Sequence, residues 1–202
     1  TFTSIATIDA QTVLYDNFQR SDNNTVGVNW LETQTAAPGS ATLLSNQLRL
    51  GGTTAGRDYI LADVSAQYNT VFNSNTSSLT WMFNMRSTRT DPSGFDAGNY
   101  GIAFILGCST NNALSGSGYA VVHGNSGTSD NLRLVKFAGG LISNAGITSV
   151  IAPIIDYGTD YLTVKVTYNP IGNNWSLFVG TNLAAFVDPT LATYTQLGAT
   201  TS

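Results

Sequence analysis

Residues 79–87 read Leu-Thr-Trp-Met-Phe-Asn-Met-Arg-Ser, with an apolar side chain at each odd position up to residue 85. In an extended chain these four side chains fall on one face, because successive side chains of a strand point to opposite sides. The other face carries mainly polar groups. A strand with one apolar and one hydrated face is typical of antiparallel sheets, so the segment predicts an antiparallel β protein.

The rest of the chain also has the sequence pattern of strands and turns. β-Branched and aromatic residues gather in runs of five to ten, bounded by Gly, Asn, Asp and Pro, which supply the backbone conformations of turns. Apolar residues do not keep a helical spacing over any long window. The predicted strands are residues 13–18, 29–35, 41–50, 57–62, 70–72, 79–87, 100–106, 118–123, 131–137, 147–151, 161–168 and 175–180. About twelve strands with short turns predict an all-β, two-sheet antiparallel β-sandwich.

Length and composition set the domain organisation. The chain has 202 residues, and sandwiches of about 200–250 residues commonly form one unit. No internal repeat or Pro-rich linker divides it, so residues 1–202 are expected to form a single domain. A chain of this length buries roughly 70% of its extended-chain surface, enough to fold without a metal or a disulfide. The one cysteine, Cys108, is expected to be a buried free thiol.

Charge is scarce, with 8 basic and 12 acidic residues and only two lysines, Lys136 and Lys165. Without a basic stripe the chain is not expected to bind nucleic acid. No apolar run approaches the ~20 residues of a membrane-spanning helix, so membrane insertion is not expected. The Thr-, Ser-, Asn- and Gly-rich composition is typical of extracellular bacterial surface proteins. We therefore expect a mature or excised segment of a secreted or cell-surface protein.

Three parts of the sequence carry a family resemblance. Residues 16–22 (DNFQRSD), followed by Gly27 and Trp30, resemble the opening strand of laminin-G-like jelly-roll domains in secreted bacterial proteins. Residues 99–106 with 118–122 are similar to the paired central strands of that superfamily, and residues 164–179 to its closing hairpin. The resemblance implies a concanavalin A-like jelly roll. That scaffold carries lectins, adhesins, carbohydrate-binding modules, hydrolases and lyases alike, so it leaves function open.

The distribution of acids argues against an enzyme. Glycoside hydrolases resembling this fold use two carboxylates, usually two glutamates on a central strand, whereas this chain has only Glu32. A polysaccharide lyase would need a His or Tyr base beside an arginine, and the chain lacks the Gln-x-His and Tyr-x-Lys patterns of jelly-roll alginate lyases. One His and one Cys exclude a zinc site built from several such ligands.

Sugar sites combine an aromatic ring, which stacks on the C–H face of a pyranose, with planar hydrogen-bonding groups. Tyr119 and His123 lie in phase on one predicted strand, with Arg86 and Arg133 on neighbouring strands and Phe95 in the loop over residues 91–99. These five residues are the candidate ligand-binding set. Converging arginines would favour an anionic glycan, because guanidinium pairs bidentately with carboxylate or sulfate. The alternative for the histidine is a strand-end side chain that caps a turn or faces water.

Calcium is the cofactor most compatible with this chain, because it binds carboxylate, amide and carbonyl oxygens. The resemblance points the same way, since jelly-roll domains of this kind often carry a calcium ion. Asp91, Asp96 and Asn99 could supply such a cage, as could Asp16 and Asp22 with a carbonyl from the segment around Asp188, although turn formation alone also explains each of these positions.

Taken together, these features predict a non-catalytic, lectin-like carbohydrate-binding or adhesion module of a larger secreted protein. Its partners would be a polysaccharide or glycan and neighbouring domains of the same protein. Two alternatives stay open: a structural or interaction spacer that binds no glycan, and a polysaccharide lyase or hydrolase. An exposed cluster of aromatic and polar side chains would favour binding, and a cleft with His123 or a tyrosine near an arginine would favour a lyase.

Overall fold

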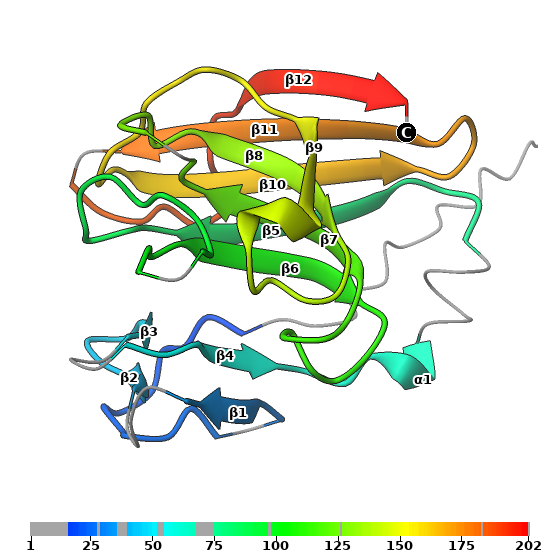
Figure 1. Cartoon of the computed structure of the whole chain (residues 1–202). Helices are drawn as coiled ribbons and strands as arrows, with labels where there is room; N and C mark the ends of the chain where they lie inside the picture. The colour runs from blue at the N-terminus through cyan, green and yellow to red at the C-terminus, as the bar shows by residue number, and fades with distance from the viewer. Residues whose placement is uncertain are drawn as a thin grey trace, which may run out of the picture. The chain divides into compact units, whose positions relative to one another are not determined.

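Two four-stranded antiparallel sheets lie face to face in the C-terminal part of the computed structural model (Figure 1). The first, here named the β10–β11 sheet, has the order β12–β11–β10–β5, and the second, the β7–β8 sheet, has the order β6–β7–β8–β9. The first contains β5 (Leu79–Met85), β10 (Tyr161–Asn169), β11 (Asn174–Asn182) and β12 (Thr195–Thr201). The second contains β6 (Ile102–Cys108), β7 (Gly118–His123), β8 (Leu132–Phe137) and β9 (Ile147–Ile151).

The chain divides into two compact units, Thr1–Asn73 and Ser74–Ser202, and each is described by itself. The expectation of a single domain over residues 1–202 stays a prediction. The all-β class and the two-sheet antiparallel β-sandwich are confirmed by the second unit. The structure describes residues 16–27, 29–35, 40–51, 55–67, 75–96, 98–125, 127–182 and 184–201.

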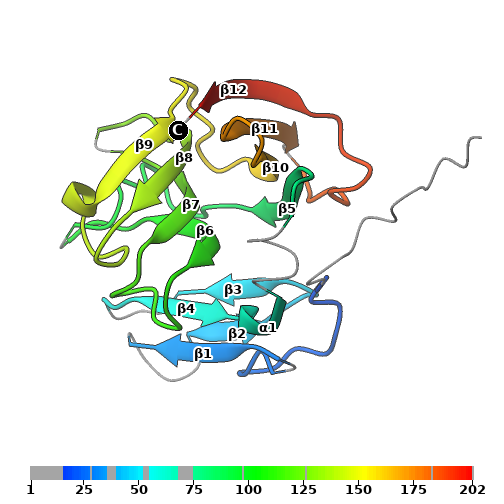
Figure 2. The same ribbon diagram turned by 90° about the vertical axis from the view of Figure 1, so that its right-hand side faces the viewer.

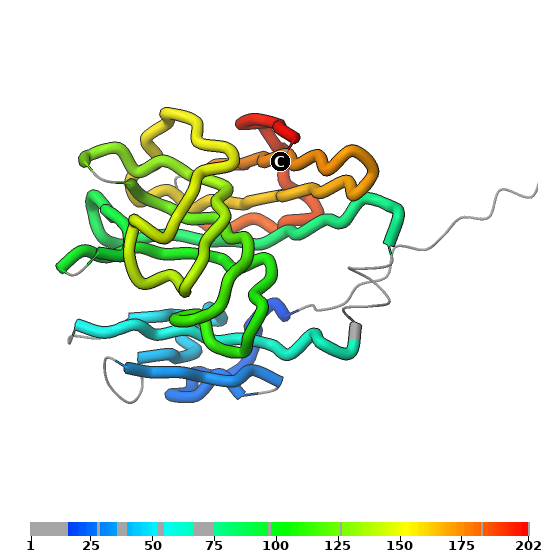
Figure 3. Tube along the Cα trace, turned by 45° about the vertical axis from the view of Figure 1, so that its right-hand side comes forward, coloured from blue at the N-terminus to red at the C-terminus, as the bar shows by residue number. Residues whose placement is uncertain are grey.

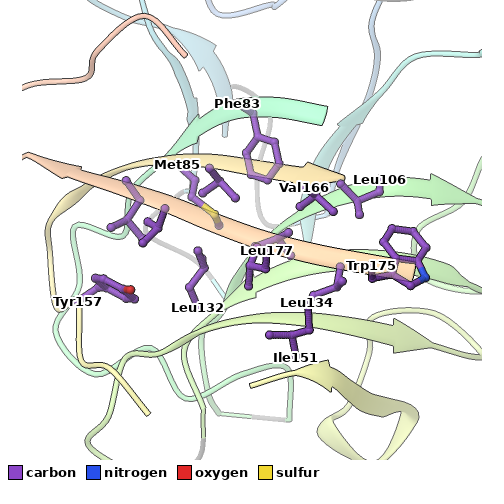
Figure 4. Close-up of a cluster of buried hydrophobic side chains, with 14 residues drawn as sticks. Phe83, Met85, Leu106, Leu132, Leu134, Ile151, Tyr157, Val166, Trp175 and Leu177 are labelled. Atoms are coloured by element: carbon purple, nitrogen blue, oxygen red, sulfur yellow. The ribbon is translucent and has the colours of Figure 1, made fainter. Parts of the chain in front are cut away.

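The core of the sandwich lies between the two sheets, where the apolar faces of the alternating strands meet (Figure 4). Phe83 stacks on Phe104 with ring centroids 3.7 Å apart, joining β5 to β6. Burial of this apolar surface is the main driving force for folding. The buried members are Phe83, Met85, Leu106, Val121, Leu132, Leu134, Ile151, Tyr157, Leu162, Val164, Val166, Trp175, Leu177 and Val179.

The outer face of the β7–β8 sheet is also covered. A second apolar cluster contains Val122, Val135 and Phe137 from its strands and Leu141 from the segment after β8, with Phe95 packed against it. Loops therefore close this face, which explains why β7 and β8 are apolar on both sides. Figure 2 shows the two sheets edge-on, with β9 beside β12.

The N-terminal unit holds two short ladders and a small core. β1 (Leu31–Gln34) pairs with β4 (Asp58–Leu61), β2 (Ala41–Leu43) pairs with β3 (Leu48–Leu50), and a single helical turn, α1, covers Ser65–Gln67. The hairpin corrects the continuous strand expected over 41–50, because Ser45 and Asn46 adopt positive φ in the turn.

The DNFQRSD segment is a turn in its described part. The Asp16 carboxylate accepts hydrogen bonds from both Arg20 Nη atoms at 2.8 and 3.1 Å and from Trp30 Nε1 at 2.7 Å. The strand expected over 13–18 is therefore absent from residues 16–18, and residues 13–15 and the strand expected over 70–72 lie outside the described residues. The motif that carried the family resemblance thus has a structural role here.

One strand was not predicted. β12 reads Thr-Gln-Leu-Gly-Ala-Thr-Thr and has almost no apolar alternation. It lies at the edge of its sheet and pairs with β11 through a register shift between Leu177 and Phe178. An edge strand needs little apolar surface of its own, which is why periodicity did not reveal it.

Candidate functional site

The outer face of the β10–β11 sheet presents aromatic, cationic and polar side chains. It is formed by the strand positions that alternate with the core residues, so its composition follows directly from the period of two. Met82 on β5 is opposite Lys165 on β10, which is opposite Phe178 on β11, and Phe178 is opposite Gln196 on β12. These side chains form one row across four strands. Three inter-strand spacings of about 4.8 Å make the row about 14 Å long.

Lys165 is held at the centre of this row by two rings. Its ammonium nitrogen lies 4.4 Å from the ring centroid of Phe178 and 4.8 Å from that of Tyr194. Tyr194 is fixed in turn, because its hydroxyl donates a hydrogen bond of 2.7 Å to the carbonyl of Pro189. Such cation–π contacts at partly exposed sites contribute about 0.5–1 kcal/mol each. The set Met82, Lys165, Phe178, Tyr194 and Gln196 is named the Lys165 cluster.

The Lys165 ammonium forms neither an ion pair nor a hydrogen bond with any described residue, and the one ion pair in the described part joins Arg20 to Asp16. The four strands of the sheet contain no Asp or Glu, and Lys165 is their only charged residue. In a chain of net charge −4, the strands of this sheet therefore contribute only a positive charge to the face.

A row of hydroxyls runs beside the cluster. Thr80 on β5 is opposite Thr167 on β10, which is opposite Ser176 on β11. Hydroxyls both donate and accept hydrogen bonds, and none of these three has a hydrogen-bond partner among the described residues. Met82 is 43% exposed, so solvent reaches the adjoining row. Together the two rows form a partly exposed surface of aromatic and polar side chains.

The other half of this face is covered by the connection from β11 to β12 (Figure 3). Asn84 Nδ2 donates a hydrogen bond of 3.0 Å to the carbonyl of Val187. A Cβ on Gly180 would lie only 2.7 Å from the carbonyl oxygen of Thr193, so glycine is needed where the connection crosses β11. Thr163 is buried beneath it. The connection therefore borders the open rows on one side.

The five residues predicted to bind a ligand are not brought together. Tyr119 and His123 share a face of β7, but it is the inner face: the Tyr119 ring stacks on Trp175 with centroids 4.6 Å apart. His123 is fully buried, and neither of its ring nitrogens has a hydrogen-bond partner among the residues that the structure describes. Burial lowers the pKa of His123, opposed by the Asp130 backbone and the charges of Asp156 and Asp160. These two side chains belong to the core.

The remaining three lie elsewhere. Arg133 is 8% exposed on the outer side of the β7–β8 sheet, where its Nη2 donates to the Gly124 carbonyl at 2.9 Å and burial lowers the pKa of the guanidinium. Arg86 lies 4.0 Å over the ring of Tyr161 and donates to its hydroxyl at 2.9 Å. Phe95 packs on the second apolar cluster. The expected convergence of arginines on one ligand is therefore not seen.

Of the three residues predicted to bind calcium in the loop over residues 91–99, Asp96 has a hydrogen-bonded carboxylate, whereas Asp91 and Asn99 are bonded through their backbone N–H groups. The Asp96 carboxylate accepts hydrogen bonds from the Asn144 backbone N–H at 2.7 Å and from its Nδ2 at 3.1 Å. The backbone N–H of Asn99 donates to the Asp96 carbonyl at 3.0 Å, and Asp91, at φ 52°, donates its own N–H to an Asp130 carboxylate oxygen. Within the described ranges, no three His, Cys, Asp or Glu side chains are grouped so that they could hold a metal ion.

Sequence reasoning also missed a buried acid. Asp130 is 2% exposed, and one of its carboxylate oxygens has no hydrogen-bond partner. Its pKa is raised by burial and by the negative charges of Asp156 and Asp91. The signal for the Lys165 cluster, by contrast, was present in the sequence: Phe178 is an aromatic residue in phase with Ser176 on the hydrated side of its strand.

Comparison with known proteins gave no relative: no protein-family model matched the chain, and no curated protein or solved structure matched it. Across the residues that the structure describes, no helix has the length and apolar character needed to cross a membrane.

Proposed function

We propose that the chain is a non-catalytic carbohydrate-binding or adhesion module of a larger secreted or cell-surface protein, and that it binds glycan on the outer face of the β10–β11 sheet. The observation that carries the proposal is the position of Phe178, an aromatic ring on the hydrated face of a strand, beside a row of hydroxyls and next to an ammonium with no ion-pair partner among the described residues. We also propose that the sandwich is a concanavalin A-like jelly roll, which its two facing antiparallel sheets support.

The chemistry of the face suits a sugar. A partly exposed ring offers an apolar surface to the C–H side of a pyranose, and the hydroxyl row offers donors and acceptors to its hydroxyls. The strands beneath are rigid, because their other face is packed into the core. Preorganised side chains lose little conformational entropy on binding, which favours recognition by a sheet face over recognition by mobile loops.

The environments of the candidate catalytic groups support a non-catalytic role. Glu32, the single glutamate, accepts hydrogen bonds from the backbone N–H groups of Val26 and Gly27 and from Gln34 Nε2. His123 is buried in the core, where a polymer substrate does not reach it. Glu32 and His123 therefore lie in structural environments, whereas the catalytic groups of a lyase or hydrolase must be accessible to the polysaccharide.

The test is a glycan-array screen of the purified chain, repeated with calcium and with EDTA so that any dependence of binding on calcium is measured in the same experiment. The proposal predicts binding to a defined glycan class that falls at least about tenfold in Phe178→Ala, the loss of roughly 1.4 kcal/mol. Ile171→Ala, which truncates an exposed apolar side chain in the turn between β10 and β11, is the matched control and should bind like the wild type. A folded protein that binds no neutral or anionic glycan would instead support the spacer alternative.

A further inference from the structure

We infer that the glycan bound on this face is acidic, and that Lys165 recognises its negative group. The inference rests on the proposed glycan-binding function and adds the chemical class of the ligand. Its basis is an imbalance of charge: Lys165 is the only charged residue in the four strands of the β10–β11 sheet, whereas the chain as a whole has twelve acids and eight bases.

The surroundings of Lys165 explain why its charge is available to a ligand. The Phe178 and Tyr194 rings hold the ammonium without neutralising it, because a ring face attracts a cation but carries no net charge. An ammonium has three N–H donors, and no described residue accepts any of them. The two rings reduce the rotamer freedom of this long side chain, which costs conformational entropy. A lysine that serves only solubility gains nothing from such restraint.

The carboxylate of Asp188 is one candidate partner for this ammonium, and it already accepts two hydrogen bonds from Thr190. Asp188 lies in the connection that borders the open rows, and its negative charge helps burial to raise the pKa of Tyr194. Its Oδ1 accepts hydrogen bonds from the Thr190 backbone N–H at 2.8 Å and from the Thr190 hydroxyl at 2.7 Å. Asp188 forms no ion pair with Lys165. A carboxylate or sulfate on a sugar lying over Phe178 could therefore pair with this ammonium, which has no anionic partner within the described part of the chain.

The experiment compares acidic polysaccharides with matched neutral ones. Polygalacturonate supplies carboxylate and carrageenan supplies sulfate ester, and the carboxyl-reduced and desulfated forms of the same polymers remove the charge and keep the sugar. Affinity would be measured at low and high salt for the wild type, Lys165→Gln and Lys136→Gln. Lys136, the other lysine, is exposed on β8 in the opposite sheet and makes a matched control.

The inference predicts that an acidic form binds more tightly than its neutral counterpart. Lys165→Gln should weaken the acidic form about tenfold, as expected for a hydrogen bond between charged groups, and change the neutral form less than about twofold. Lys136→Gln should have no effect. Salt should weaken only the acidic form.

Equal binding of charged and neutral forms, or equal effects of the two lysine substitutions, would overturn this inference and leave the proposed function standing. If no polysaccharide binds, whether neutral or acidic, both fail together. Preference for polygalacturonate or for carrageenan identifies the anionic group as carboxylate or sulfate.

Discussion

The ammonium of Lys165 lies 4.4 Å from the ring centroid of Phe178, on the outer face of the β10–β11 sheet. Most of the polar strand positions here can be explained by solvation alone, but this pair cannot. An aromatic ring on the hydrated side of a strand has no core to fill, and a lysine between two rings is restrained without being neutralised. The pair is therefore the central feature of the proposed binding surface.

Removing the lysine should affect stability only slightly. Lys165→Gln abolishes two cation–π contacts of about 0.5–1 kcal/mol each and is expected to lower the free energy of unfolding by about 1–2 kcal/mol at most. Lys136→Gln should change it by less, because no ring contact to that side chain is present among the described residues. Urea unfolding of the two variants checks this. A loss of several kcal/mol in Lys165→Gln would mean that the lysine is a structural residue, and its effect on binding could not then be assigned to recognition.

Tyr119 should behave as a core residue. Its ring stacks on Trp175 between the sheets, so Tyr119→Ala is expected to lower the free energy of unfolding by about 3 kcal/mol, near the lower end for large aromatic truncations. Tyr119→Phe keeps the ring and should leave both stability and glycan binding near the wild-type values. If Tyr119→Phe abolished glycan binding while the protein stayed folded, the ligand would have to reach the inner face of β7, contrary to this account.

Replacing the buried acid should stabilise the protein. The folded-state pKa of Asp130 is raised above 3.8, first by burial and then by Asp156 and Asp91, so the folded chain loses stability as the pH rises from about 3.8 through the raised pKa. Asp130→Asn removes this charge and is expected to increase the free energy of unfolding at pH 7 by about 1 kcal/mol. The gain should shrink as the pH falls through the raised pKa and vanish below about pH 3.8, where the wild-type acid is protonated in both states.

The control for Asp130→Asn is Asp63→Asn, because the pKa of Asp63 is shifted in the opposite direction. Asp63 is exposed, and hydrogen bonds from the Ser65 side chain and backbone lower its pKa. Asp63→Asn should therefore give no gain in stability at pH 7. Urea unfolding at both pH values decides the matter, and a loss of stability in Asp130→Asn at neutral pH would show that the charge of Asp130 is stabilising.

His123 should make the protein sensitive to acid. Burial lowers its folded-state pKa below 6.5, so the unfolded chain takes up a proton first. Stability is then lost as the pH falls from about 6.5 through the lowered pKa. Because neither ring nitrogen is hydrogen-bonded, His123→Leu should be tolerated and should flatten the stability profile between pH 7 and pH 5. Unfolding curves at a series of pH values test this, and parallel profiles for the two proteins would exclude His123 as the titrating group.

The strands and their faces could be predicted wherever apolar and polar residues alternate. In β5, β10 and β11 the alternation placed Phe83, Val164 and Leu177 correctly in the core. In β7 the alternation could not identify the inner face, because residues 119–123 are mainly apolar in both phases. Which face was inner depended on packing between distant strands, and Tyr119 and His123 were assigned to a ligand surface although they point into the core.

The location of the open surface could not be read from single strands either. The outer face of the β7–β8 sheet is closed because Phe95 and Leu141, from two separate loops, pack on it. The face with Lys165 stays partly open because the connection from β11 to β12 covers only half of it. A hydrogen bond between Asn84 and Val187 fixes the connection in that position. Both outcomes depend on long-range contacts, whereas alternation reports only that a face is polar or apolar.

The most direct test of the account is to map the bound glycan by two-dimensional ¹H–¹⁵N NMR, titrating the labelled chain with the strongest ligand from the array. If the account is right, the backbone signals that shift will be those of residues near Lys165, Phe178 and Gln196, while signals of residues around Tyr119 and His123 stay in place. Shifts confined to other surfaces, or to the core around His123, would contradict the assignment of the outer face of the β10–β11 sheet as the binding site.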